Sequence, residues 1–151
     1  MVPNYSEIFF SRFGGPILAE RLTSGLQGPD RQRLRTIMSS RHYEKGQIIF
    51  SKDLVPREIV VLASGSAELK CGDTAGDRRK VMPGEVFGLS ETLAEAKYCD
   101  SLMALSDCEI NVIGRDELIT YLRSTPEACY RSLEVIAENL HLARDRAVGD
   151  H

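Results

Sequence analysis

The sequence predicts a mainly β fold, a β-roll of the jelly-roll type with N-terminal helices and a long C-terminal helix. Two observations carry this prediction. Short apolar runs separated by turn residues fill residues 42–113, with no helical pattern between them. Helical spacing of apolar residues returns on either side of that region. With 151 residues, 42% of them hydrophobic, the chain is large enough for one core and short for two.

The segment before the roll predicts an irregular start and then one helix. Residues 1–28 contain several glycines and prolines that interrupt any long element, so only short helices are expected, at 5–12 and 16–24. Pro29 suits the first turn of a helix, which the pattern extends to Ser39. The apolar side of this helix consists of Leu34, Ile37 and Met38.

The middle of the chain reads as a series of strands. Turn residues such as Gly46, Gly65 and Pro83–Gly84 separate runs rich in Val, Ile, Leu and Phe. The expected strands are 47–50, 58–63, 66–71, 79–82, 101–105 and 109–113. Many short strands at close spacing, without alternating helices, favour a sandwich or a β-roll.

Two helices are expected after the roll, at 116–123 and from Pro126 to Val148. The apolar residues of the second helix are spaced by four and three, which is a heptad seam. They are Cys129, Leu133, Ile136, Leu140, Ala143 and Ala147. Such a seam either packs back on the roll or pairs with the same helix of a second chain, and a homodimer is expected. The predicted division is 1–28, then a roll domain over 29–123, then a dimerisation helix over 124–151.

The composition excludes several classes of protein. The formal net charge is −3, and the pI of about 5.6 does not favour direct binding of nucleic acid. No apolar run is long enough to cross a membrane, and the N-terminus lacks the pattern of a signal peptide. The four cysteines form no C-x-x-C pair and have no histidine at ligand spacing, so no metal is expected. Reduced thiols in a cytoplasmic protein are the expectation.

Three segments carry a resemblance to a known family. They are the runs 44–50, 59–69 and 83–88, in which Gly46, Gly65, Gly84 and Gly88 stand in order. From about residue 34 to 148 the chain resembles the cyclic-nucleotide-binding domain of bacterial regulators of the catabolite-activator and FNR type. The resemblance implies that backbone N–H groups after Gly84 and Gly88 cradle the cyclic phosphate. The alternative is that these glycines only turn corners of the roll.

The candidate ligand site inherited through this resemblance runs along one segment. Its residues are Gly84, Glu85, Val86, Phe87, Gly88, Leu89, Ser90, Glu91, Lys97, Tyr98 and Cys99. Members of the family that bind cyclic nucleotides have a Glu for the ribose where this chain has Leu89, and an Arg for the phosphate where it has Tyr98. Losing both contacts weakens binding by roughly 3–6 kcal/mol. Leu89, Tyr98 and Leu102 are expected to line a more apolar pocket instead.

The sequence therefore predicts a ligand-sensing regulatory module with altered specificity, for a cyclic nucleotide or another small ligand. The alternative is a dimeric scaffold with a non-functional pocket. Because the chain ends three residues after Val148, no helix-turn-helix is expected to follow, and the module is expected to stand alone. An enzyme is not expected. The histidines His42, His141 and His151 are too far apart for a cupin-type metal site, and no G-x-S-x-G motif is present.

Overall fold

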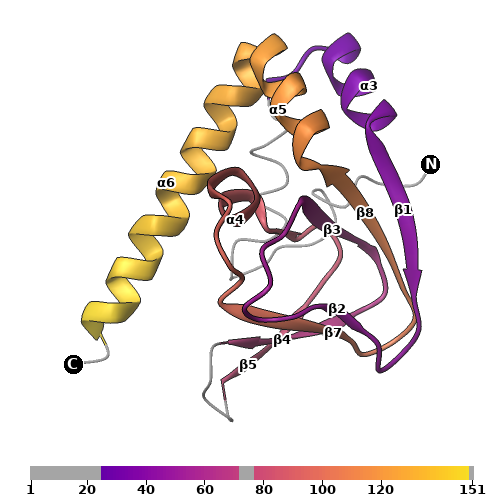
Figure 1. Ribbon diagram of the computed structural model, residues 1–151, viewed down its shortest axis with the longest axis vertical. Helices are drawn as coiled ribbons and strands as arrows, with labels where there is room; N and C mark the ends of the chain where they lie inside the picture. Colours follow the sequence, from indigo (N-terminus) through magenta and orange to yellow (C-terminus); the bar gives the residue numbers. More distant parts are fainter. Residues whose placement is uncertain (1–24, 72–76, 150–151) are drawn as a thin grey trace.

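A computed structural model describes residues 25–71 and 77–149, and the side chains of the last helix as far as residue 138. Two four-stranded antiparallel sheets form the roll, in the orders β1-β8-β3-β6 (the first sheet) and β2-β7-β4-β5 (the second sheet). Figure 1 shows the helices gathered at one end and along one side of the two sheets. The strands are β1 Met38–Tyr43, β2 Ile48–Phe50, β3 Glu58–Ser64, β4 Ala67–Cys71, β5 Arg78–Val81, β6 Val86–Phe87, β7 Asp100–Ala104 and β8 Cys108–Gly114. The helices are α3 Gly28–Thr36, α4 Leu89–Ala94, α5 Arg115–Ser124 and α6 Pro126–Gly149.

The predicted jelly-roll fold is confirmed, and each of the six predicted strands is present. The two helices after the roll are also present, as α5 and α6. Strands β1 and β6 and helix α4 were not predicted. The helices expected at 5–12 and 16–24 lie outside the described residues.

The expected extension of the first helix to Ser39 is wrong. Helix α3 ends at Thr36, and Met38 already pairs with Ile113 of β8. Met38 packs in the same apolar cluster as Leu34 and Ile37 of the helix, which is why its spacing mimicked one more helical turn. The rest of β1 is polar because the strand lies at the edge of its sheet, where its side chains stay exposed.

Two apolar clusters lie on opposite faces of the first sheet. Along β3, Val60 and Leu62 point into the roll, whereas Ile59 points to the helix side. Because side chains alternate along a strand, a strand covered on both faces reads as a continuous apolar run. The interior cluster of the roll also holds Phe50 and Tyr98, and this cluster positions the candidate site.

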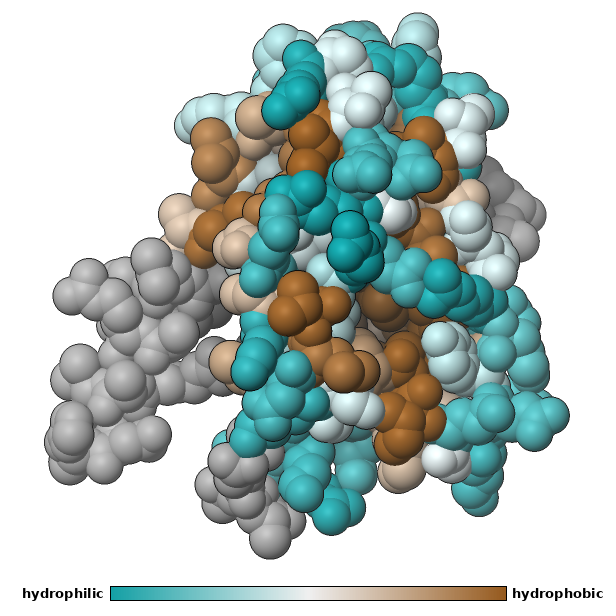
Figure 2. All heavy atoms as spheres, in the orientation of Figure 1, coloured by the Kyte–Doolittle hydropathy of each residue, from teal (hydrophilic) through white to brown (hydrophobic). Residues whose placement is uncertain are grey.

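As far as residue 138, where its side chains are described, helix α6 packs one face against the rest of the domain. Ala128, Ser132 and Val135 are buried against the rest of the domain, while Leu133 of the predicted seam is 61% exposed. At Leu133 the seam therefore does not pack back on the roll, whereas Ile136 of the same seam packs in the apolar cluster on the helix side of the first sheet. No helix in the described part of the chain is long and apolar enough to cross a membrane. In Figure 2 the apolar side chains on the face in view form separate groups among hydrophilic ones.

Candidate functional site

The predicted site lies on a continuous segment, Gly84–Asp100, which we call the cradle segment. It contains the corner after β5, strand β6, helix α4 and the stretch that leads into β7. The N–H of Gly84 donates to the carbonyl oxygen of Leu62 at 2.8 Å, and the N–H of Leu62 donates to that of Glu85 at 3.1 Å. These two bonds fix the start of the cradle segment on β3, so Gly84 turns a corner of the roll.

Gly88 stands where β6 ends and α4 begins, and no other residue fits there without strain. Its φ angle is +85°, in the left-handed region. A Cβ atom on Gly88 would lie 2.8 Å from the hydroxyl oxygen of Tyr98 and 3.3 Å from the carbonyl oxygen of Glu58. The backbone of Gly88 is therefore in direct contact with the side chain at the other end of the cradle segment.

Tyr98 fills the interior next to Gly88. Tyr98 is only 5% exposed. Its ring stacks on that of Phe50, with the ring centroids 4.0 Å apart and an angle of 14° between the ring planes. The N–H of Asp53 donates to the carbonyl oxygen of Tyr98, and the N–H of Tyr98 donates to that of Leu54, both at 2.9 Å. The last residue of β2 thus holds the ring of Tyr98, and the segment that follows β2 holds its backbone.

Burial and two carboxylates determine the electrostatic setting of Tyr98. Burial raises the pKa of the Tyr98 phenol well above its usual range, and the charges of Glu91 and Glu58 raise it further. The hydroxyl therefore stays neutral and has carboxylates as its charged neighbours. The resemblance places the cation that grips a phosphate at this position, and the chain has a neutral phenol there.

Glu85 has a structural role at the corner before β6. Its buried carboxylate accepts a hydrogen bond from Arg79 at 2.5 Å and another from the N–H of Met82 at 2.9 Å. The side chain of Arg79 is 19% exposed and comes from β5. Sequence reasoning missed Arg79. Arg79 stands two residues before the apolar Val81, so the alternation of a strand places both on the covered face of β5, whereas Arg78 and Lys80 face solvent.

The remaining predicted residues do not gather around Tyr98. Leu89 is buried in the helix-side cluster with Ile59, Leu118 and Val135, whereas Tyr98 and Leu102 belong to the interior cluster. The expectation that Leu89 lines the same pocket as Tyr98 and Leu102 is therefore wrong, because the start of α4 turns Leu89 to the other face of the sheet. Ser90 donates to the carboxylate of Glu91 at 3.3 Å, and Lys97 and Cys99 are exposed. Phe87, Gly88 and Tyr98 are the predicted residues that the fold brings together with Phe50.

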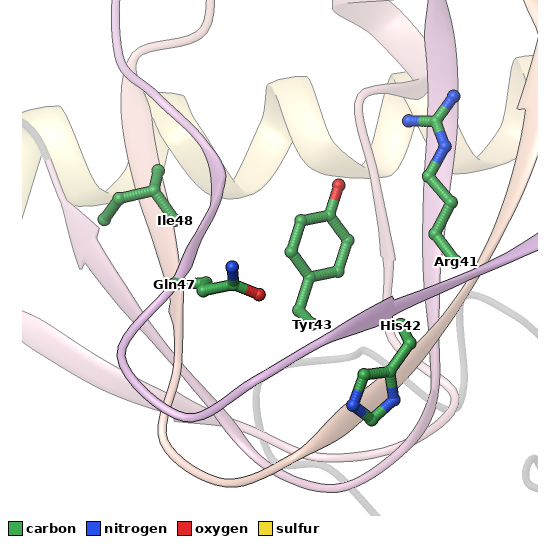
Figure 3. A pocket seen from close by; sticks show the side chains of 5 residues that line it. All are labelled: Arg41, His42, Tyr43, Gln47 and Ile48. Carbon is green, nitrogen blue, oxygen red and sulfur yellow. The ribbon is translucent and has the colours of Figure 1, made fainter.

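A hollow of about 530 Å³ lies away from the cradle segment, where the edge strands β1 and β2 meet. Its lining residues are Arg41, His42, Tyr43, Gln47 and Ile48, shown in Figure 3. The sequence did not single out this place. A run of polar residues that ends in Tyr43, just before a turn, is the one local signal that marks it.

Comparison with known proteins places the chain beside bacterial regulators. A family model described as the cyclic nucleotide-binding domain matches residues 40–125. The cyclic AMP receptor protein of Thermus thermophilus is 26% identical over 106 residues, which cover 68% of this chain and 49% of that protein. The chain thus spans about half the length of this curated relative.

Solved structures share the fold. The catabolite activator protein of Thermus thermophilus gives a TM-score of 0.76 at 24% identity, covering 84% of this chain and 61% of that one. The N-terminal domain of a transcriptional regulator from Streptomyces coelicolor gives a TM-score of 0.69 at 21% identity, covering 85% of this chain and 95% of that one. A cyclic nucleotide-binding domain from Methylobacillus flagellatus gives a TM-score of 0.71 at 14% identity, covering 89% of this chain and 82% of that one. At these identities the likeness concerns the fold alone.

Proposed function

Because the chain belongs to the cyclic nucleotide-binding domain family, we propose that it is a non-enzymatic regulatory module that senses a small ligand other than a cyclic nucleotide. The observation that carries the proposal is the position of Tyr98. Its buried ring occupies the place where the resemblance puts the phosphate-binding arginine, and its hydroxyl lies against Gly88.

The binding energy expected to be lost at this position is an argument against a cyclic phosphate. A hydrogen bond to a charged group contributes about 1.5–3 kcal/mol, and an Arg–phosphate pair makes two of them. Each 1.4 kcal/mol is about a factor of ten in affinity. Without the arginine, and with Leu89 turned to the helix side, a micromolar site becomes weaker by two orders of magnitude or more, on the order of 3–6 kcal/mol.

The chemistry of the interior supports a different kind of ligand. Phe50, Phe87 and Tyr98 provide a group of aromatic rings. The carboxylates of Glu91 and Glu58 raise the pKa of the Tyr98 hydroxyl, and that of Glu58 is itself paired with Arg41. Rings beside carboxylates favour a flat ligand that is neutral or positively charged over an anion. Such a ligand has to displace the ring of Tyr98 from Phe50.

The test is a calorimetric titration of cyclic AMP into the chain, into Tyr98→Arg and into Tyr98→Phe. We expect no measurable heat of binding for the wild type or for Tyr98→Phe, because neither has a cation at this place. Tyr98→Arg is expected to gain at least about tenfold in affinity, from one restored charge-assisted contact. Micromolar binding by the wild type would refute the proposal.

A second candidate function is a dimeric scaffold with a closed interior, and the tight packing of Tyr98 on Phe50 favours it. In both functions we propose that α6 pairs with α6 of a second copy, since Leu133 is exposed on the predicted seam. Leu133→Glu is expected to halve the mass in sedimentation. Leu54→Glu, at a residue 59% exposed, is the matched control and is expected to leave the mass unchanged. A monomeric wild type would contradict the pairing.

The two candidates differ in their response to ligands. A sensor gains stability from a ligand that binds its folded state, whereas a scaffold with a closed interior does not. A screen of flat amines and nucleosides by melting temperature therefore separates them. The cytoplasmic location and the division at residues 28 and 123 stay predictions.

A further inference from the structure

The polar end of the Tyr98 side chain has no partner in the described part of the chain. The residue is only 5% exposed, and its ring stacks on Phe50 while its hydroxyl lies against Gly88. No hydrogen bond of this hydroxyl is present among the described residues. Buried hydroxyl groups normally have a hydrogen-bond partner, because burial without one costs free energy. The place of the Tyr98 hydroxyl is therefore a candidate position for a polar group of a ligand.

The groups around this place are hydrogen-bond acceptors. The hydroxyl oxygen of Tyr98 and the carbonyl oxygen of Glu58 lie 2.8 Å and 3.3 Å from one point, the position that a Cβ atom on Gly88 would take. The Glu58 carbonyl accepts the hydroxyl of Thr92 at 3.0 Å, and its second lone pair can accept another donor. The charge of the Glu91 carboxylate also reaches the Tyr98 hydroxyl. Such a set of acceptors complements a donor group that carries a positive charge.

Glu91 differs from the other glutamates of the cradle segment because it has no cation beside it. Glu85 is paired with Arg79, and Glu95 is paired with Arg115 at 3.0 Å. For Glu91, no Lys, Arg or His nitrogen lies within 4 Å in the part of the chain that the structure describes. Its carboxylate therefore lacks a counter-charge next to the aromatic interior.

The place of Glu91 in α4 leaves its carboxylate available. Glu91 is the third residue of the helix that Gly88 caps, where a glutamate commonly folds back onto the N–H of the capping residue. Among the described residues this hydrogen bond is not made, and the carboxylate instead accepts the hydroxyl of Ser90 at 3.3 Å. Arg115, which reaches α4 from α5, donates to the carbonyl oxygen of Thr92 at 3.0 Å. The helix thus positions Glu91 without using its charge.

From these observations we infer that the ligand is an aromatic ring that bears a primary ammonium group, an inference that rests on the proposed function. The ring of the ligand takes the place of the Tyr98 ring on Phe50. The ammonium takes the place of the Tyr98 hydroxyl and donates to the carboxylate of Glu91 and the carbonyl oxygen of Glu58. Pairing with Glu91 offsets the desolvation of the ammonium. The side chain of Tyr98 thus has the shape of the ligand and competes with it for the site.

The test compares three probes that share one ring and differ in charge. At about pH 7 benzylamine is a cation, benzyl alcohol is neutral and benzoate is an anion. Each is titrated into the full chain and followed by the amide signals of Phe50 and Gly88 in NMR spectra. Benzylamine is expected to bind at least about tenfold more tightly than benzyl alcohol, through one charge-assisted contact. Benzoate is expected not to bind.

Substitutions locate the site. Glu91→Gln removes the charge and keeps the shape, so it is expected to weaken the binding of benzylamine at least about tenfold and that of benzyl alcohol less than about twofold. Glu95→Gln, at a side chain of the same helix end that is 67% exposed, is the matched control and is expected to change both less than about twofold. Tyr98→Ala removes the competing ring and is expected to strengthen the binding of benzylamine at least about tenfold. If Tyr98→Ala does not fold, the wild type and Glu91→Gln decide.

The outcomes separate this inference from the proposed function. Equal affinity of the wild type for benzylamine and benzyl alcohol would overturn the inference and leave a sensor of a neutral ligand. An unchanged affinity of Glu91→Gln for benzylamine would also overturn it, as would the absence of binding by all three probes. Micromolar binding of cyclic AMP, in contrast, would refute the proposed function itself.

Discussion

The two ends of the cradle segment differ in what they keep of the family. At Gly84 and Gly88 the chain keeps the glycines, both with positive φ angles. At Tyr98, where the resemblance implies a side chain that grips a ligand, it has an aromatic residue that packs on Phe50. The glycines serve the roll itself, since Gly84 is hydrogen-bonded to β3 and Gly88 is packed against Tyr98. The two ends therefore have different roles: the glycines shape corners of the roll, and Tyr98 fills its interior.

The largest effect on stability is expected at Tyr98, the end of the cradle segment that is packed in the interior. Tyr98→Ala is expected to lower the free energy of unfolding by about 3–5 kcal/mol, as for other buried aromatic residues. Urea denaturation measures this change. Tyr130→Ala removes a ring that is 57% exposed and is the control, with an expected change under about 0.5 kcal/mol. A loss below about 1 kcal/mol for Tyr98→Ala would contradict this prediction, because the ring of Tyr98 would then contribute little packing energy to the interior.

The second largest loss of stability is expected at Gly88. Gly88→Ala is expected to cost about 2–3 kcal/mol, from the left-handed backbone and the contact with the Tyr98 hydroxyl. Gly46→Ala also has a positive φ angle, but its Cβ meets nothing within 4 Å, so about 1 kcal/mol is expected. Combining Gly88→Ala with Tyr98→Phe should recover part of the loss. Equal losses for Gly46→Ala and Gly88→Ala would show that the two ends do not touch.

A smaller effect is expected at the corner that joins the two sheets. Glu85→Gln is expected to destabilise by about 1–2 kcal/mol, because the half-buried Arg79 loses its counter-charge. The ion pair of Glu68 with Arg78, 3.1 Å long and more exposed, gives the matched control. Glu68→Gln is expected to cost under about 0.5 kcal/mol. Thermal melting of both variants measures the difference, and equal values would mean that the buried pair of Glu85 with Arg79 stabilises the fold no more than an exposed ion pair does.

The smallest effect concerns the reactivity of two thiols, the exposed Cys99 next to Tyr98 and the buried Cys108. Burial raises the pKa of the Cys108 thiol, so at a given pH it carries less thiolate, the reactive form. Cys99 is exposed. Iodoacetamide at about pH 8 is therefore expected to modify Cys99 first and Cys108 last, as followed by mass spectrometry. Faster modification of Cys108 would mean that the interior opens readily.

Much of the roll could be predicted because its strands are buried on one or both faces and so carry an apolar pattern. Strand β1 and helix α4 could not, since β1 is a polar edge and α4 has only six residues. The orientation of Leu89 depends on the left-handed turn at Gly88, which one sequence does not define. The hollow depends on how far apart two sheet edges lie, a property of tertiary packing alone.

The central claim is that Tyr98 has replaced the phosphate grip. Its most direct test is the melting temperature of the wild-type chain with and without cyclic AMP at about 50 µM, since a ligand well above its dissociation constant stabilises the folded state. We predict no shift. A rise of several degrees would contradict the account.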